Sequence, residues 1–238
     1  MEQTLSGKVA IVTGGTRGIG RAIAERLLRE GAAVAVCSRS QQNVQTFVKD
    51  FQTIADGRLL GEAADVSKAE DVQRFFASVD AQLGGVDFLI NNAGLGIFKS
   101  VADLTPEDWR RTIDLNLSGV YYCSHEALPR MRKRGAGYIV NIGSLAGKNA
   151  FAGGAAYNAS KFGLNGFSEA MMLDHRYDNV RVSCIMPGSV DTDFAARSGA
   201  AAWKIQPEDI ADVVAMLLRM PPRTLISRVE IRPSKPQK

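Results

Sequence analysis

The chain has 238 residues, of which 45% are hydrophobic and 23% are charged, and its formal net charge is +4. This composition fits one globular domain over residues 1–238, and the dispersed basic residues exclude a nucleic-acid-binding surface of the usual kind. No apolar run reaches the roughly 18 residues that a membrane-spanning helix needs, and the N-terminus has no signal-peptide pattern, so we expect a cytoplasmic protein.

Short β-branched runs alternate along the chain with longer segments of helical period. We predict strands at 8–13, 32–38, 58–65, 86–94, 137–144, 180–188 and 225–233. We predict helices at 18–31, 41–53, 69–84, 105–135, 154–176 and 206–220. Apolar strands that alternate with helices are typical of a parallel sheet with helices on both faces. The predicted fold is therefore α/β, a doubly wound parallel sheet of seven strands whose ligand lies at the carboxyl ends of the strands.

Three further features give weaker indications. The three cysteines and two histidines lack any metal-ligand spacing, so we expect no metal site and three reduced, buried thiols. The basic cluster RMRKR at 130–134 has two interpretations, cations that complement the dipole at a helix C-terminus or a docking patch for an acidic partner.

The stretch TGGTRGIG at 13–20 follows the first strand and opens the first helix. Gly14 and Gly18 permit a tight turn with close backbone approach, and Gly20 lets the helix pack near the sheet. The free N–H groups of the helix N-terminus then face the pyrophosphate of a dinucleotide. The spacing departs from the G-x-G-x-x-G pattern, so the strand–turn–helix context carries the prediction.

The end of the second predicted strand indicates which dinucleotide binds. An enzyme that uses NAD places an acid there for the ribose 2′-hydroxyl, whereas this chain has Ser38 and Arg39, and Arg17 adds a second guanidinium in the glycine turn. A guanidinium suits a phosphate dianion, so we predict NADP(H) as the cofactor.

Tyr157 and Lys161 lie four positions apart on a predicted helix and therefore share a face. A lysine cation about 4 Å away, at an effective dielectric constant near 20, favours a phenolate by about 4 kcal/mol. We therefore expect the pKa of Tyr157 to be lowered towards neutrality, where the phenol can act as general acid and base. Ser144 ends a predicted strand at the ligand edge and can hydrogen-bond a carbonyl oxygen there.

The glycine turn, NNAG at 91–94, Asn116, Ser144, YNASK at 157–161 and PG at 187–188 occur in that order. The set resembles the classical short-chain dehydrogenase/reductase family, a single-domain Rossmann fold, over residues 8 to about 193. The resemblance implies Tyr157 as acid and base, Lys161 also on the nicotinamide ribose, Ser144 on the substrate carbonyl and Asn116 as holder of a water that relays protons. It implies further cofactor contacts from Thr16, Ile19, Asp65, Val66, Asn92, Ala93, Gly94, Pro187, Gly188, Val190 and Thr192.

Two departures from the family pattern bear on the substrate. The lid segment at about 189–206 is short, which predicts an open site and loose or large substrates, and the C-terminus lacks the glycine-rich finish of many 3-oxoacyl carrier-protein reductases. We expect a homodimer or homotetramer through the helices at 107–134 and 157–176. Position predicts an apolar lining from Leu95, Ile97, Phe98, Phe151, Phe194 and Trp203.

Several functions remain open on the sequence. The first is an NADP(H)-dependent reductase that interconverts a carbonyl and a secondary alcohol, with 3-oxoacyl thioesters and an acyl carrier protein as candidate substrate and partner. The alternatives are a sugar, polyol or steroid dehydrogenase, and a nucleotide-binding sensor without turnover. The intact Ser144, Tyr157 and Lys161 favour an enzyme.

Overall fold

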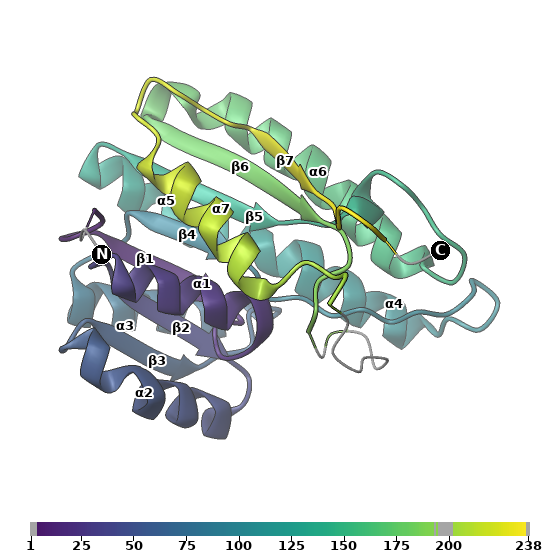
Figure 1. Cartoon of the computed structure of the whole chain (residues 1–238), viewed down its shortest axis with the longest axis horizontal. Helices are drawn as coiled ribbons and strands as arrows, with labels where there is room; N and C mark the ends of the chain where they lie inside the picture. The colour runs from purple at the N-terminus through teal and green to yellow at the C-terminus, as the bar shows by residue number, and fades with distance from the viewer. Residues whose placement is uncertain (1–3, 193, 195–201, 237–238) are drawn as a thin grey trace.

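The computed structural model describes residues 4–192, 194 and 202–236, and its centre is one parallel sheet. The strand order is β3-β2-β1-β4-β5-β6-β7, and each neighbouring pair is parallel. The strands are β1 Val9–Thr13, β2 Ala33–Ser38, β3 Leu59–Ala63, β4 Phe88–Asn91, β5 Gly137–Ile142, β6 Val180–Pro187 and β7 Arg228–Ile231. All seven strands therefore end at one edge of the sheet, the edge toward the C-terminus in Figure 1.

Helices cover both faces of this sheet (Figure 1). One face carries α1 Gly18–Arg29, α2 Gln41–Ala55 and α7 Pro207–Arg219. The other face carries α3 Ala69–Leu83, α5 Gly119–Arg134 and α6 Ala155–His175, and α4 Pro106–Ile113 packs beside α6. The doubly wound α/β fold with seven parallel strands is confirmed. None of the helices in the described part of the chain is both long and apolar enough to cross a membrane.

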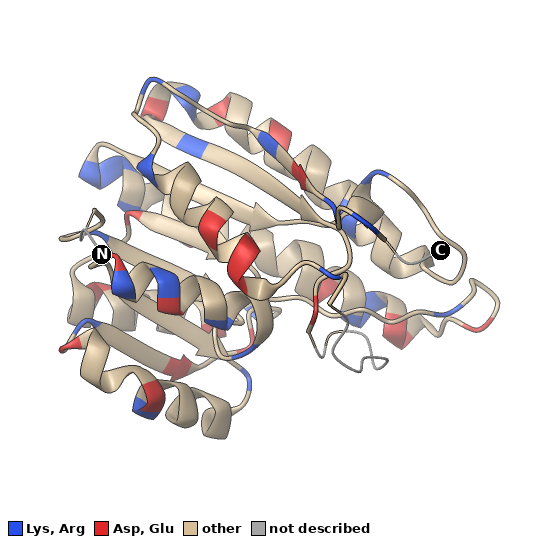
Figure 2. Ribbon diagram, viewed as in Figure 1, with Lys and Arg blue, Asp and Glu red and all other residues tan. Residues whose placement is uncertain are grey.

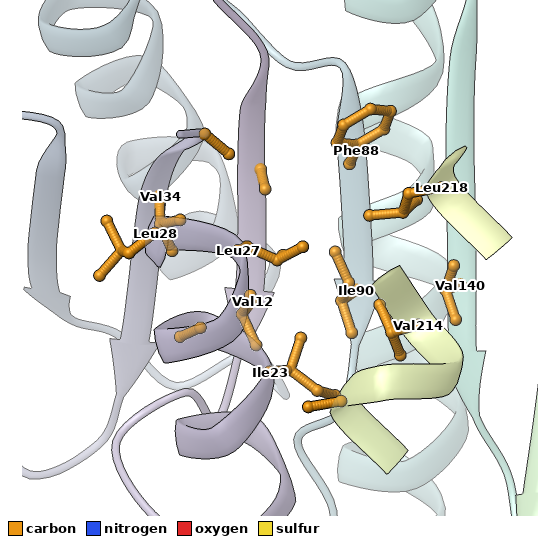
Figure 3. Close-up of a cluster of buried hydrophobic side chains, with 14 of the residues drawn as sticks. Val12, Ile23, Leu27, Leu28, Val34, Phe88, Ile90, Val140, Val214 and Leu218 are labelled. Carbon is orange, nitrogen blue, oxygen red and sulfur yellow. The ribbon is translucent and has the colours of Figure 1, made fainter. Parts of the chain in front are cut away.

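The core under α1 and α7 shows why these segments fold as they do. Ile23 and Leu27 recur at helical spacing on α1 and are fully buried. Figure 3 shows them directed at side chains from the strands and from α7, among them Val12, Ile90, Val140, Val214 and Leu218. Burial of each such side chain stabilises the fold by roughly 1.5–3 kcal/mol, so the two helices are held flat against the strands.

Local signals in the sequence set several boundaries correctly. Thr105 caps α4, with its Oγ1 accepting from the backbone N of Asp108 at 3.1 Å, and Pro106 takes the first helical position. Gly135, with φ of 78°, ends α5 in the left-handed conformation. The three cysteines are free and buried, as predicted.

Other boundaries differ from the prediction. The helical region expected at 105–135 is interrupted by a π turn, Asp114–Ser118, between α4 and α5. The strand expected at 86–94 stops at Asn91, and the one expected at 225–233 is only Arg228–Ile231. Strands end where the neighbouring strand no longer offers a backbone partner, which apolar patterning alone does not reveal.

Candidate active site

A large cavity of about 1070 Å³ lies along the carboxyl ends of the strands. Of the predicted catalytic and cofactor-binding residues, only Gly20 and Asn116 are absent from its wall. Those that line it are Gly14, Thr16, Arg17, Gly18, Ile19, Ser38, Arg39, Asp65, Val66, Asn92, Ala93, Gly94, Ser144, Tyr157, Lys161, Pro187, Gly188, Val190 and Thr192. We call the part around Gly14–Gly20 and Arg39 the glycine end, and the part around Ser144 and Tyr157 the tyrosine end.

The glycine end has a backbone surface that side chains would fill. Gly14 has φ of 62°, and a Cβ there would meet the Cα of Ala93 at 3.0 Å. Gly18 has φ of 52°, also in the left-handed region. A Cβ on Gly20 would collide with the carbonyl oxygen of Gly14 and the amide of Asn92. The turn therefore opens α1 with its N–H groups free to face an anion.

Thr13, which sequence reasoning missed, supports this turn from beneath. Its Oγ1 accepts from the backbone N–H groups of Asn92 and Ala93, both at 3.0 Å. The side-chain amide of Asn92 donates back to the carbonyl oxygens of Thr13 at 2.9 Å and Gly14 at 3.2 Å. These bonds join the ends of β1 and β4, and a polar residue at the last position of a buried strand is the signal that points to them.

Two arginines border the glycine end. Arg17 and Arg39 are exposed, and neither forms an ion pair with the residues that the structure describes. Asp65 follows β3, the strand beside β2, and its carboxylate accepts from the backbone N and the Oγ of Ser67, at 3.1 and 2.7 Å. The two guanidinium groups therefore keep their donors for a ligand, whereas Asp65 is held by its own loop.

Tyr157 and Lys161 lie together on α6, as the spacing predicts. Both are buried, and the Nζ of Lys161 lies 5.8 Å from the centre of the Tyr157 ring. The same Nζ donates to the carbonyl oxygen of Ile142 at 2.9 Å, which ties α6 to the end of β5. Ser144 stands two residues beyond β5, where its Oγ accepts from the backbone N of Ala146 at 3.1 Å.

The expected lowering of the Tyr157 pKa is wrong for this structure. Burial raises the pKa of Tyr157, and a hydrogen bond with Ser144 offsets only part of that rise. Burial also lowers the pKa of Lys161 to about 8, so desolvation weakens the ammonium that was expected to stabilise a phenolate. Tyr157 therefore keeps its proton at neutral pH, which is the state that a general acid needs.

Asn116 lies in the π turn and is buried, away from the cavity wall. Its amide donates to the carbonyl oxygen of Leu95 at 2.9 Å and to the Oγ of Ser160 at 3.1 Å, and its Oδ1 accepts from the backbone N of Leu95 at 2.9 Å. Both amide hydrogens are thus committed to the protein, so any water that Asn116 holds must use its remaining lone pair or its backbone. The observed bonds fix the loop after β4 against α6.

Aromatic rings form the outer wall of the tyrosine end. The ring of Phe98 lies 5.5 Å from that of Tyr157 and 5.8 Å from that of Phe151, and the ring of Phe194 lies 5.9 Å from that of Tyr157. Trp203 also lines the cavity, whereas Leu95 and Ile97, which were expected there, do not. Leu95 instead packs against the core beneath α3, α5 and α6.

The lid predicted at about 189–206 is joined at its base. The backbone N of Asp191 donates to the carbonyl oxygen of Ile205 at 2.8 Å, and the N of Ile205 donates to the oxygen of Ser189 at 3.1 Å. Residue 193 and residues 195–201 lie outside the described residues.

The basic cluster at 130–134 forms the last turn of α5, where Figure 2 shows blue. Because α5 leads into the start of β5, this cluster lies at the edge of the sheet opposite the cavity. Arg130 pairs with Asp80 at 2.8 Å, Arg132 with Asp178 at 2.8 Å, and Arg134 with Asp87 at 3.0 Å. These pairs favour the structural interpretation of the cluster over the docking patch.

Comparison with known proteins identifies the family of this chain. A family model described as short chain dehydrogenase matches residues 8–203. The chain belongs to the short-chain dehydrogenase family. The protein is therefore an oxidoreductase. A rabbit (Oryctolagus cuniculus) relative, dehydrogenase/reductase SDR family member 4, is 40% identical over 87% of this chain and 78% of its own. A 3alpha-hydroxysteroid dehydrogenase of Mediterraneibacter gnavus is 33% identical over 91% of this chain and 92% of its own.

Two solved oxidoreductase structures are similar to this chain over nearly its whole length. A metagenomic short-chain oxidoreductase in complex with NADP is 38% identical with a TM-score of 0.86, over 98% of this chain and 100% of its own. An alcohol dehydrogenase of the archaeon Thermococcus sibiricus, complexed with 5-hydroxy-NADP, is 30% identical with a TM-score of 0.90, over 97% of this chain and 99% of its own.

Proposed function

We propose that the protein is an NADP(H)-dependent oxidoreductase that interconverts a carbonyl and a secondary alcohol, with Tyr157 as general acid and base. The observation that carries this proposal is that Ser144, Tyr157 and Lys161 border the same cavity as the glycine turn. The NADP complexes of two similar structures support the choice of dinucleotide.

The glycine end fits a dinucleotide. The close approach of Gly14 to Ala93 leaves a backbone cradle that a Cβ would fill, and Arg17 and Arg39 offer guanidinium donors at its rim. Arg39, which follows β2, would bind the ribose 2′-phosphate, and Lys161 would bind the nicotinamide ribose. Bound NADPH would supply the hydride for carbonyl reduction.

At the tyrosine end the protein residues supply the proton and the orientation. The Oγ of Ser144 donates to the substrate oxygen, while the protonated Tyr157 hydroxyl delivers its proton as negative charge develops there. The ammonium of Lys161, held on the Ile142 carbonyl, stabilises the phenolate left behind. In the oxidation direction the same phenolate takes the alcohol proton.

The aromatic wall favours a bulky apolar substrate. Phe98, Phe151 and Phe194 are each nearly half exposed beside Tyr157, so they offer apolar area to a ligand. A steroid-like alicyclic ketone suits these rings, and the similarity to a 3alpha-hydroxysteroid dehydrogenase supports that class. A 3-oxoacyl thioester remains the second candidate, although three arginines of the 130–134 cluster are paired with acids of this chain, which weakens that cluster as a docking site for an acyl carrier protein.

We further propose that two copies of the chain associate through α4, α5 and α6, as a homodimer or as half of a homotetramer. Trp109, Tyr121, Phe162 and Leu173 are between 43% and 51% exposed on these three helices. α4 and α5 both pack beside α6, and large apolar side chains left exposed on neighbouring helices are typical of an interface between subunits. Sedimentation velocity tests this, because a monomer at micromolar concentration contradicts it.

The function is tested by the oxidation of NADPH and NADH with a panel of alicyclic ketones, acetoacetyl thioester and sugars. We expect turnover with NADPH and a weaker reaction with NADH. Arg39→Gln should raise the Kd of NADPH by about tenfold without changing that of NADH, since one charge-assisted contact is lost. Lys49→Gln, an exposed charge change on α2, should alter neither value. Binding of NADPH without turnover of any substrate would favour a sensor instead.

A further inference from the structure

The C-terminal end of β7 reaches the tyrosine end of the cavity. β7 is the last strand of the sheet, and the two residues that follow it, Arg232 and Pro233, line the cavity together with Tyr157. Figure 2 shows basic residues at this end of the strand. Sequence reasoning placed no site residue in this segment.

Two contacts fix the end of β7 beside Ser144. The backbone N of Gly188 donates to the carbonyl oxygen of Ile231 at 2.8 Å, which completes the pairing with β6. Lys148, from the turn that Ser144 caps, donates to the Oε1 of Glu230 at 2.5 Å. Arg232 therefore projects from a segment anchored to the turn that carries Ser144.

The charges along the cavity differ between its two ends. Charged side chains in the described wall are Arg17, Arg39, Asp65, Lys161, Lys204 and Arg232. The single acid, Asp65, follows β3 near the glycine end, so every charged side chain in the described wall of the tyrosine end is a cation. Such a wall attracts anionic substrates.

Arg232 is the exposed cation at the tyrosine end of the described wall. Lys161 is buried beneath Tyr157, and Lys204 is mostly buried and paired with Asp191 at 3.6 Å. Arg232 is 53% exposed and touches Glu230 at 2.9 Å, a carboxylate that it shares with Lys148. One carboxylate between two cations leaves a positive charge at the mouth of the cavity.

We propose that Arg232 binds a carboxylate on the substrate and so determines its specificity; this rests on the carbonyl–alcohol function proposed above. The planar guanidinium matches a carboxylate through two parallel hydrogen bonds. Neighbouring strands lie about 4.8 Å apart, so the ends of β5 and β7 are roughly 10 Å apart across β6. The substrate is therefore an apolar ketone or secondary alcohol whose carboxylate lies several bonds from the reacting carbon.

The test compares an alicyclic or aryl keto acid with its own methyl ester as substrates of the full chain with NADPH. We expect the acid to have the higher kcat/KM, through a lower KM. Arg232→Gln should lower kcat/KM for the acid by about 10- to 100-fold and leave the ester unchanged, because only the acid loses a charge-assisted pair. Arg232→Lys should restore part of the loss.

Arg228→Gln is the matched control, since Arg228 opens β7, outside this cavity, and its loss removes the same charge from the strand that leads to Arg232. It should leave both substrates unchanged. Equal kcat/KM for acid and ester in the wild type, or an equal loss for both in Arg232→Gln, overturns the role of Arg232 while leaving the reductase function intact. If neither acid nor ester oxidises NADPH, although NADPH binds, the proposed function itself is wrong.

Discussion

The two ends of the cavity lie on the same sheet edge but are built differently. At the glycine end the ligand surface is backbone, with Gly14 at φ of 62° and held from beneath by Thr13 and Asn92. At the tyrosine end the outer wall is side chain, from Phe98 and Phe151, which are 44% and 46% exposed. A backbone surface has one shape and suits one cofactor, whereas exposed rings on loops adapt to different substrates.

The largest expected effect is at the reacting centre of the tyrosine end. Tyr157→Phe removes the proton donor and should lower kcat by about 10²- to 10⁴-fold, while the Kd of NADPH stays within about twofold. Steady-state kinetics and NADPH fluorescence measure the two quantities. Tyr138→Phe removes the hydroxyl of the other buried tyrosine, which lies 2.8 Å from the Oγ of Ser183, and should leave kcat unchanged. Normal turnover by Tyr157→Phe would remove the tyrosine from the mechanism.

The glycine end should not tolerate an added methyl group. Gly14→Ala combines a left-handed φ with a 3.0 Å approach to the backbone of Ala93, so we expect the Kd of NADPH to rise by about 10- to 100-fold. Gly57→Ala is the matched control, because it has φ of 77° with nothing within 4 Å. Both variants should lose roughly 1 kcal/mol of unfolding free energy from backbone strain, but only Gly14→Ala should weaken cofactor binding. Equal Kd values for the two variants would contradict a rigid cradle.

The tyrosine end should tolerate change. Phe151→Ala removes one exposed ring, so the KM of a bulky alicyclic ketone should rise by about tenfold, with the Kd of NADPH unchanged. A small ketone such as cyclohexanone should show little change, since it does not reach the outer wall. Tyr177→Ala, a 92% exposed aromatic outside the cavity, is the control. Loss of activity toward large and small ketones alike would contradict this, because it would show that Phe151 shapes the space around the reacting carbon and not only the outer wall.

The smallest expected effect is a pH dependence of cofactor binding. Burial lowers the pKa of Lys161 to about 8, and an anionic dinucleotide nearby favours its protonated form. Binding then takes up a proton as the pH rises through this value, so the Kd of NADPH should increase about threefold between pH 7.5 and pH 8.5. Fluorescence titrations across this range measure it. Lys161→Met should bind NADPH more weakly at pH 7, and its Kd should not rise over this pH range. If the Kd of this variant rises with pH as in the wild type, the titrating group is not Lys161.

Local sequence pattern alone determined the fold class of this protein and the position of two of its motifs. Apolar runs such as 8–13 and helical periods such as 18–31 follow from side-chain alternation along the chain, so the α/β sheet was predictable. The glycine turn and the Tyr157–Lys161 pair were predictable for the same reason, because each is a short segment whose geometry is set by its own spacing.

The tertiary structure decided what depends on distant segments. Burial is a property of the packed molecule, and it raises the pKa of Tyr157, opposite to the direction expected from the neighbouring lysine alone. Thr13 supports the turn only because β4 lies beside β1, and Arg232 reaches the cavity only because β7 pairs with β6. Strand order brings together residues that are far apart in the chain, and no local pattern records which of them will meet.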